Sequence, residues 1–248
     1  MKSVLVTGSK GFLGNTLISK LKRDGKVNVL EFDRSSSLDS LSDALEQADF
    51  IAHFAGEVRP SCSDEEFVTS NAGLTELLIK RLEKSKKKTP ILFTSTIHAI
   101  NPKNAYGESK KAAELVLAEY AHRNEALVWL YRLPHVFGPG CKPNYNSVIS
   151  TWIYNSIHDL EINVFDRSIV MNYCYAPDLA EEFSALVGTE AERVGIEDMQ
   201  PSKVYPTTLG DVVDSISAIK NGCFDVSDEF GQHLLTTYNS YLPNGKRL

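Results

Sequence analysis

The stretch "TGSKGFLG", residues 7–14, places three glycines between an apolar run and a helical pattern. The preceding run SVLV favours a β-strand, and the apolar residues from Phe12 onward recur with helical spacing. A helix N-terminus presents unpaired N–H groups and the positive end of its dipole, so a glycine turn that enters a helix suits phosphate. The glycine spacing is one residue longer than the usual G-x-G-x-x-G pattern. We predict that the turn binds the pyrophosphate of a dinucleotide through Gly8, Gly11, Phe12, Leu13 and Gly14.

The composition of the 248 residues excludes several classes of protein. The net charge of −6 leaves no basic footprint for nucleic acid. No apolar run approaches the roughly 20 residues of a membrane helix, and the N-terminus lacks the pattern of a secretory signal. The four cysteines are scattered, without the spacing of a disulfide framework or a zinc site. We expect a cytoplasmic protein that binds no metal, nucleic acid or membrane.

Apolar strand-like runs alternate with amphipathic segments through the first half of the chain. Four such runs follow the glycine turn: VNVLEFD (27–33), DFIAHFAG (49–56), PILFTST (90–96) and ALVWLYRL (126–133). Repeated β-α-β units of this kind form a parallel sheet with helices on both faces. We therefore predict an α/β fold, with a Rossmann-type doubly wound parallel sheet in residues 1–140. A smaller C-terminal substrate-binding lobe is expected over residues 141–248, with segments that return to the main sheet.

The residues after the second predicted strand bear on the choice of dinucleotide. Asp33 ends that strand about 20 residues beyond the glycines, where an acidic residue typically binds the ribose hydroxyls of NAD. Arg34 and Ser35 follow, and an arginine with hydroxyls is typical of a 2′-phosphate site. The Asp33 carboxylate would repel that phosphate unless its side chain turns away. The sequence leaves both dinucleotides open and favours NADP(H) over NAD(H).

The segment YGESK (106–110) sets Tyr106 and Lys110 one helical turn apart on the same face. A phenol has an ordinary pKa of about 10, and a nearby ammonium group lowers it toward the range useful for proton transfer. Thr96 ends the fourth predicted strand, where its hydroxyl can bind the oxygen that gains or loses a proton. The Y-x-x-x-K pattern occurs often by chance. Together with the glycine turn, it predicts acid–base chemistry at Thr96, Tyr106 and Lys110.

With these motifs the chain resembles the extended short-chain dehydrogenase/reductases over essentially its whole length. The resemblance implies that the glycine turn binds NAD(P), that Thr96, Tyr106 and Lys110 form the active site, and that Lys110 also contacts the nicotinamide ribose. The segment HFAG matches the strand on the adenosine side of the cofactor, and YRLPHVFGPG matches the segment beside the nicotinamide. The further cofactor contacts implied are Phe54, Ala55, Gly56, Pro134 and His135.

A closer resemblance is to the reductase domain of bifunctional capsular-polysaccharide enzymes that make a UDP-N-acetyl-L-fucosamine precursor. It rests on YGESK, CKPNYNSVI (141–149) and TTYNSYLP (236–243). In those enzymes an NADPH-dependent reductase is joined to a cupin domain that epimerises the sugar. The resemblance implies reduction of the 4-keto group of a UDP-2-acetamido-2,6-dideoxy-hexos-4-ulose. It also implies a cupin epimerase domain or partner, and a homodimer formed through helices near 66–84 and 106–123.

Polar residues after the nicotinamide segment are candidate ligands for the nucleotide sugar. Such donors suit an acetamido sugar and its diphosphate, although an ordinary polar loop that caps the next helix would look the same. In FDRS (165–168), the arginine is a further candidate for the diphosphate, or it lies in a hairpin turn. The candidate substrate contacts are Lys142, Asn144, Tyr145, Asn146 and Arg167.

Two departures from the extended family bear on substrate and reaction. Met171 stands where many relatives carry a phosphate-binding arginine, so another residue must bind that phosphate. Ile97 and His98 follow Thr96, where the sugar dehydratases carry an acid pair, so dehydration is disfavoured. Asn71 does match the helix asparagine of the family.

Three functions stay open at this point. The first is an NADPH-dependent nucleotide-sugar 4-ketoreductase of capsular or surface polysaccharide synthesis. The second is a redox-neutral UDP-sugar 4-epimerase with tightly bound NAD, which would use the same three residues. The third is a non-catalytic cofactor-sensing protein, which the intact Tyr106 and Lys110 disfavour.

Overall fold

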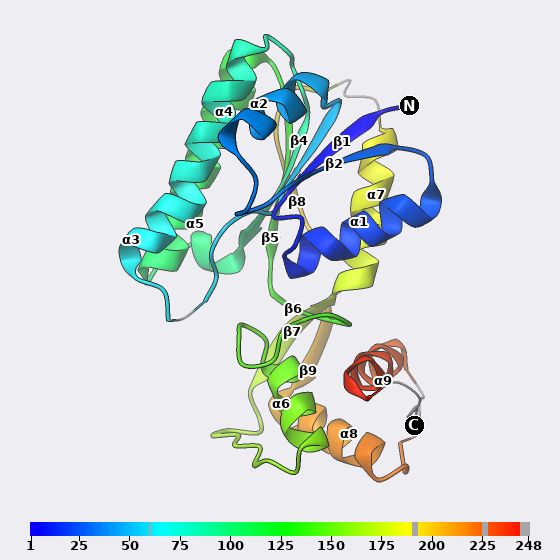
Figure 1. Cartoon of the computed structure of the whole chain (residues 1–248). Helices are drawn as coiled ribbons and strands as arrows, with labels where there is room; N and C mark the ends of the chain where they lie inside the picture. Colours follow the sequence, from blue (N-terminus) through cyan, green and yellow to red (C-terminus); the bar gives the residue numbers. More distant parts are fainter. Residues whose placement is uncertain (60, 190–192, 225–227, 244–248) are drawn as a thin grey trace. The chain divides into compact units, whose positions relative to one another are not determined.

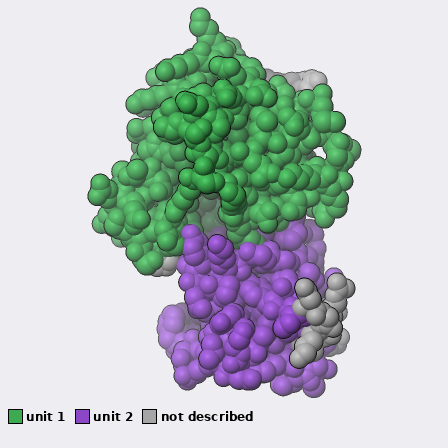
Figure 2. All heavy atoms as spheres, viewed as in Figure 1, with its two compact units in different colours: residues 1–133, 180–201 green, residues 134–179, 202–248 purple. Residues whose placement is uncertain are grey.

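The computed structural model describes residues 1–59, 61–189, 193–224 and 228–243. The chain divides into two compact units, residues 1–133 with 180–201 and residues 134–179 with 202–248 (Figure 2). Within the described ranges, no helix combines the length and the apolar character needed to cross a membrane.

In chain order the elements are β1 (Ser3–Thr7), α1 (Phe12–Asp24), β2 (Asn28–Phe32), α2 (Leu38–Gln47), β3 (Phe50–His53), α3 (Asp64–Phe67), the π-helix η1 (Val68–Gly73), α4 (Leu74–Lys84), β4 (Ile91–Thr96), the 3-10 helix η2 (Ile97–Ala99), α5 (Ala105–Asn124), β5 (Leu127–Leu133), β6 (His135–Phe137), α6 (Val148–Ile157), β7 (Val170–Tyr175), α7 (Ala176–Gly188), β8 (Gly195–Met199), β9 (Tyr205–Thr208), α8 (Leu209–Lys220) and α9 (Glu229–Tyr241) (Figure 1).

Six parallel strands in the order β2-β1-β3-β4-β5-β8 form the sheet of the first unit. Helices α2, α4 and α5 cover one face, and α1 and the C-terminal part of α7 cover the other (Figure 1). The edge strand β8 comes from residues 195–199, far along the chain from its neighbour β5. The predicted Rossmann-type doubly wound sheet is thus confirmed.

Burial on both faces explains why the strands of this sheet read as continuous apolar runs. Val4, Leu5 and Val6 of β1 are fully buried. Helix α1 buries Leu17 and its apolar neighbours on one side and ends at Asp24, and the φ of +66° at the C-cap Gly25 allows the left-handed C-terminal turn.

The strand order creates a switch point beside β1. The chain leaves β1 for β2 on one side and returns to β3 on the other, and in open α/β sheets ligands bind outside the carboxyl ends of the strands at such a point. Pairing of Thr7 with His53 places the glycine turn beside the residues that follow β3. Thr96, at the carboxyl end of β4, lies on the same edge of the sheet.

The second unit has its own sheet and core. Strand β7 pairs in parallel with β6 and antiparallel with β9. Helices α6, α8 and α9 contribute Trp152, Val212 and Leu234 to an apolar cluster that also contains Phe137 and Tyr173. This unit carries the candidate substrate contacts.

Candidate active site

The glycine positions of the turn leave little room for a Cβ atom. Gly8 has a φ of +70°, and a methyl group there would lie 2.8 Å from the backbone nitrogen of Ala55. A methyl group at Gly14 would overlap the carbonyl oxygen of Gly8, which also accepts a hydrogen bond from the N–H of Gly11 at 2.8 Å. The turn therefore packs directly against both its own helix and the end of β3.

The same turn offers donors to an anionic group. Gly11 is the N-cap of α1 and has no side chain to bind the first N–H groups of the helix, those of Phe12 and Leu13. The hydroxyl of Ser9 is buried and has no hydrogen-bond partner among the described residues. Free backbone donors, an unpaired hydroxyl and a surface without Cβ atoms fit the pyrophosphate of a dinucleotide.

At the end of β2, Asp33 is bound by a lysine from the glycine turn. The Lys10 ammonium lies 2.8 Å from Asp33 Oδ2 and donates to the Ser35 hydroxyl at 3.0 Å. The N–H and hydroxyl of Ser35 each donate to Asp33 Oδ1 at 2.7 Å. Hydrogen bonds from Lys10 and then Ser35 hold the pKa of Asp33 well below its ordinary value. Sequence reasoning missed Lys10, because only the pairing of β1 with β2 brings it to Asp33.

Arg34 is held by a second carboxylate that sequence reasoning also missed. Its Nη2 lies 2.5 Å from Oε2 of Glu57, and Nη2 of Arg59 lies 2.9 Å from the same oxygen. Burial alone would raise the pKa of Glu57, but hydrogen bonds from Arg59 and Arg34 outweigh it and bring that pKa below its ordinary value. The side chain of Arg34 remains largely exposed, so its guanidinium can meet a further anion.

The residues after β3 line the glycine turn from the other side. The N–H of Ala55 donates to the Thr7 hydroxyl at 3.2 Å, and that hydroxyl is 2.7 Å from Nδ1 of the buried His53. Burial, with a smaller effect of the Lys110 charge, lowers the pKa of His53 to about 3, so its imidazole is neutral at ordinary pH. Phe54 packs on Phe183, with ring centres 5.7 Å apart.

Gly56 packs against the amide of Asn71. The two backbone groups of Glu57 bind that amide: its N–H donates to Oδ1 at 2.9 Å, and its carbonyl accepts from Nδ2 at 3.2 Å. Nδ2 also donates to the hydroxyl of Ser109 at 2.9 Å, and that hydroxyl donates to the carbonyl of Tyr106 at 2.9 Å. The loop after β3 and the start of α5 are therefore joined through one buried asparagine.

Tyr106 lies in the first turn of α5, which begins after the N-cap Asn104. The side chain of Asn104 accepts from the N–H of Gly107 at 2.9 Å. The phenol of Tyr106 is hydrogen-bonded to the hydroxyl of Thr96. The sequence predicts that a nearby ammonium lowers the pKa of Tyr106. In the structure burial raises this pKa and the bond from Thr96 lowers it by less, so the phenol is protonated at neutral pH.

Lys110 is buried one turn further along α5. Its Nζ donates to the carbonyl of Thr94 at 2.9 Å and lies 4.9 Å from the centre of the Phe93 ring. Burial lowers the pKa of Lys110 to about 8, against the negative charge of Glu114, which raises it. Tyr106 and Lys110 are thus each bound to a residue in the last three positions of β4, Tyr106 to Thr96 and Lys110 to Thr94.

The remaining predicted cofactor contacts belong to the second unit. Pro134 precedes β6, and His135 is the first residue of that strand, with its half-buried ring 5.9 Å from the ring of Tyr173. Their assignment to the nicotinamide stays a prediction.

The polar loop before α6 is exposed. Lys142 lies on the surface. Residues 144–148 and Thr151 line a surface hollow of about 470 Å³. The N–H of Asn144, which has a φ of +54°, donates to the hydroxyl of Thr151 at 3.0 Å. The predicted contacts that line this hollow are Asn144, Tyr145 and Asn146.

Arg167 lies in the turn before β7. Its Nη2 donates to Oδ1 of Asp214 at 2.6 Å and to the carbonyl of Gly210 at 3.3 Å. The backbone of Arg167 also accepts from the N–H of Gly210 at 2.9 Å. These contacts hold the turn to the start of α8, and the assignment of Arg167 to the diphosphate stays a prediction.

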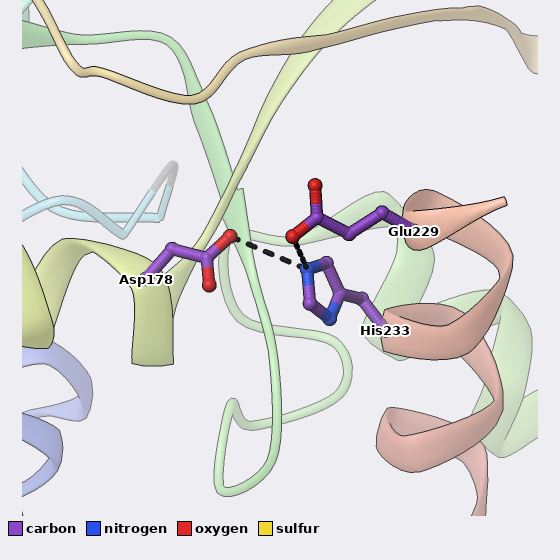
Figure 3. Close-up of side chains that lie close together, drawn as sticks. All are labelled: Asp178, Glu229 and His233. Atoms are coloured by element: carbon purple, nitrogen blue, oxygen red, sulfur yellow. Dashed lines mark ion pairs between the residues drawn. The ribbon is translucent and has the colours of Figure 1, made fainter.

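A further cluster of charged side chains in the second unit was not predicted. Nε2 of His233 lies 3.3 Å from Asp178 Oδ2 and 3.8 Å from Glu229 Oε1 (Figure 3). Burial lowers the pKa of His233, although both carboxylates raise it. The three ligand atoms are close enough for a metal ion. However, the ammonium of Lys203 binds Glu229 and lies 4.0 Å from Asp178, so a cation of the chain already offsets part of the negative charge of the cluster.

The comparisons with known proteins agree with this geometry. The model of the NAD dependent epimerase/dehydratase family matches residues 4–196. The chain is 32% identical over 245 residues to UDP-2-acetamido-2,6-beta-L-arabino-hexul-4-ose reductase of Pseudomonas aeruginosa. The aligned residues cover 97% of this chain and 65% of that protein.

Solved structures show the same relationship. The capsular polysaccharide assembling protein CapF of Staphylococcus aureus has a TM-score of 0.83 and 35% identity, over 97% of this chain and 66% of that one. A UDP-glucose 4-epimerase of Thermus thermophilus in complex with NAD shares the fold, with a TM-score of 0.73 and 20% identity over 88% of this chain and 83% of that one. The chain spans less than two thirds of the length of the Pseudomonas and Staphylococcus proteins.

Proposed function

The chain belongs to the NAD dependent epimerase/dehydratase family, and from this premise we propose that it reduces the 4-keto group of a UDP-2-acetamido-2,6-dideoxy-hexos-4-ulose with NADPH. The Pseudomonas relative is a UDP-2-acetamido-2,6-beta-L-arabino-hexul-4-ose reductase, which supports this substrate class. The observation that carries the proposal is a pair of contacts at the carboxyl end of β4: Thr96 is hydrogen-bonded to the protonated phenol of Tyr106, and Lys110 donates to the carbonyl of Thr94.

Each of the three side chains has a role in that reaction. When bound, the reduced nicotinamide supplies the hydride that reduces the carbonyl carbon. Tyr106 donates its proton to the carbonyl oxygen, and Thr96 orients that oxygen and the phenol. The positive charge of Lys110 stabilises the phenolate that remains until solvent returns the proton.

The protonated state of Tyr106 suits reduction. A group that gives a proton to the substrate must carry that proton at the start of the reaction, and burial keeps this phenol protonated. A UDP-sugar 4-epimerase would also need the phenol as a base in its first half-reaction.

The charged side chains at the end of β2 support NADPH as the cofactor. Lys10 and Ser35 bind the carboxylate of Asp33, so its charge is compensated where a 2′-phosphate would lie. The exposed guanidinium of Arg34, tied to Glu57 through one nitrogen, can donate to the phosphate with its other groups. The ammonium of Lys10 adds a second positive charge.

The proposal includes two partners, a second copy of the chain and a cupin epimerase domain, joined or separate, that prepares the sugar. Val68 of η1 and Leu115 of α5 are both more than half exposed, and such apolar side chains suit a protein partner on these helices. Light scattering of the purified protein would measure the oligomeric state, and a monomer at micromolar concentration would contradict the dimer.

The test is a spectrophotometric assay of NADPH oxidation in the presence of a UDP-4-keto-6-deoxy-N-acetyl sugar. Tyr106→Phe removes only the acidic hydroxyl, so turnover should fall by at least about 100-fold. The matched control is Tyr120→Phe, which removes a buried hydroxyl of the same helix that bonds the Thr89 carbonyl at 2.9 Å, and it should keep turnover. Isomerised sugar without net NADPH loss would show an epimerase instead. Equal turnover in Tyr106→Phe and the unaltered protein would refute the assignment.

A further inference from the structure

We propose that Glu114 is a positioning residue of this active site. Its buried carboxylate fixes α5 to β4 at Ser95, between the two strand residues that bind Tyr106 and Lys110. The consequence for turnover rests on the proposed function, whereas the positioning itself does not.

Three consecutive residues of β4 bind three successive turns of α5. Thr96 is hydrogen-bonded to Tyr106, and the carbonyl of Thr94 accepts from Lys110 Nζ. Between them, the hydroxyl of Ser95 donates to Glu114 Oε1 at 2.6 Å. Positions 106, 110 and 114 share one face of the helix because they are four residues apart. The strand and the helix are therefore held in register by the Glu114 contact next to the two functional ones.

Arg132 of β5 fixes the other side of the same carboxylate. Its Nε donates to Glu114 Oε1 at 3.0 Å and its Nη2 to Oε2 at 2.7 Å. Such paired bonds define the orientation of a carboxylate as well as its position. The remaining Nη1 lies 2.5 Å from Oδ2 of Asp198 on β8. One carboxylate thus connects α5 with β4 and β5, and through Arg132 with β8.

The surroundings of this carboxylate make it rigid. The side chain of Glu114 is 4% exposed and that of Arg132 is 17% exposed. On the same helix, the partly exposed Lys111 has its Nζ 3.7 Å from Oε2. A buried, bidentate pair with little access to water holds its geometry better than a surface ion pair does.

The negative charge of Glu114 also acts on Lys110. Burial lowers the pKa of Lys110 to about 8, and Glu114 opposes that effect. Lys110 also faces the carbonyl of Thr94 and the ring of Phe93, and the neutral His53 lies near enough to feel its charge. Removing the charge of Glu114 should therefore let Lys110 lose its proton at lower pH.

Two variants and one control test the proposal on the full chain with NADPH bound. Ser95→Ala removes only the bond from β4 and leaves the pair of Glu114 with Arg132 intact, so it should fold. Glu114→Gln keeps the shape of the side chain and removes its charge. The control is Glu182→Gln, which replaces a carboxylate of α7 that accepts from Tyr131 of β5 at 2.8 Å on the opposite face of the sheet.

The first readout needs no sugar. Hydrogen exchange of peptides over residues 94–110 should accelerate in Ser95→Ala and Glu114→Gln and stay unchanged in Glu182→Gln. Unchanged exchange over residues 94–110 in Ser95→Ala would overturn the proposal, whether or not the protein reduces the sugar.

The second readout is turnover. In Ser95→Ala, kcat should fall by roughly 10- to 100-fold, since small misplacements of reacting groups have effects of this size, while the KM for NADPH changes by less than about twofold. In Glu114→Gln the alkaline fall of kcat should begin at lower pH than in the unaltered protein, an effect that mere loosening of the fold does not produce. Faster exchange with unchanged kcat would overturn the catalytic consequence. If the unaltered protein does not reduce the sugar at all, the proposed function fails and the exchange data alone decide the positioning.

Discussion

Replacing Gly8 by alanine should destabilise the first unit by roughly 2–5 kcal/mol, from two contributions. The φ of +70° lies in the left-handed region, where a residue with a Cβ atom is disfavoured by about 1–2 kcal/mol. The added methyl group would also lie 2.8 Å from the nitrogen and 3.0 Å from the Cα of Ala55. Overlap with rigid backbone of this kind costs about 1–3 kcal/mol.

Gly25 provides a control with the same backbone conformation and no close neighbour. Its φ is +66°, and a methyl group there would have nothing within 4 Å. Gly25→Ala should therefore cost only the backbone contribution, about 1–2 kcal/mol. The difference between the two variants isolates the close approach of the glycine turn to the end of β3.

Urea unfolding followed by fluorescence would measure both variants. The chain has two tryptophans, and Trp129 is buried in β5 of the first unit, so a Trp152→Phe background makes it the reporter of that unit. NADPH titration of the same proteins should show weak binding for Gly8→Ala and unaltered binding for Gly25→Ala. An equal loss of stability in the two variants would refute the reasoning, because the contact with Ala55 would then contribute nothing.

Lys10→Ala and Arg34→Ala should each raise the KM for NADPH by roughly 10- to 100-fold, because each removes a charge-assisted hydrogen bond. The KM for NADH should stay within about threefold. Equal effects on both cofactors would contradict a 2′-phosphate site. Turnover should fall as the pH rises through about 8, because burial lowers the pKa of Lys110 to about 8 and the lysine is charged only below that pH. A pH profile of kcat that is flat to pH 9.5 would contradict a role for charged Lys110. Stability should fall as the pH drops from about 6.5, since unfolded histidine binds a proton there, while buried His53 stays neutral until about 3. Thermal unfolding at pH 7 and pH 5 checks this, and His53→Gln should lose less stability over that interval.

Features that depend on local geometry could be predicted from the sequence. Glycines at 8, 11 and 14 between a strand and a helix predict close backbone approach at these three positions, and the structure has backbone atoms where a Cβ atom would be. The alternation of apolar runs and helical segments predicted the parallel sheet, which the structure confirms. Four-residue spacing placed Tyr106 and Lys110 on one face of α5, because helical periodicity fixes such relations within a single element.

Contacts between distant segments were decided by the tertiary structure alone. Lys10 meets Asp33 only because β2 lies beside β1, and Glu57 meets Arg34 only because β3 returns on the other side of β1. The direction of the Tyr106 pKa shift was mispredicted for the same reason. A neighbouring lysine can be inferred from spacing, but the burial that raises this pKa is set by every element packed around the phenol. The sequence by itself thus determined the turn and the sheet and predicted the candidate reactive groups, whereas charge pairing and proton affinity depend on distances and desolvation that exist only once the strands and helices are packed.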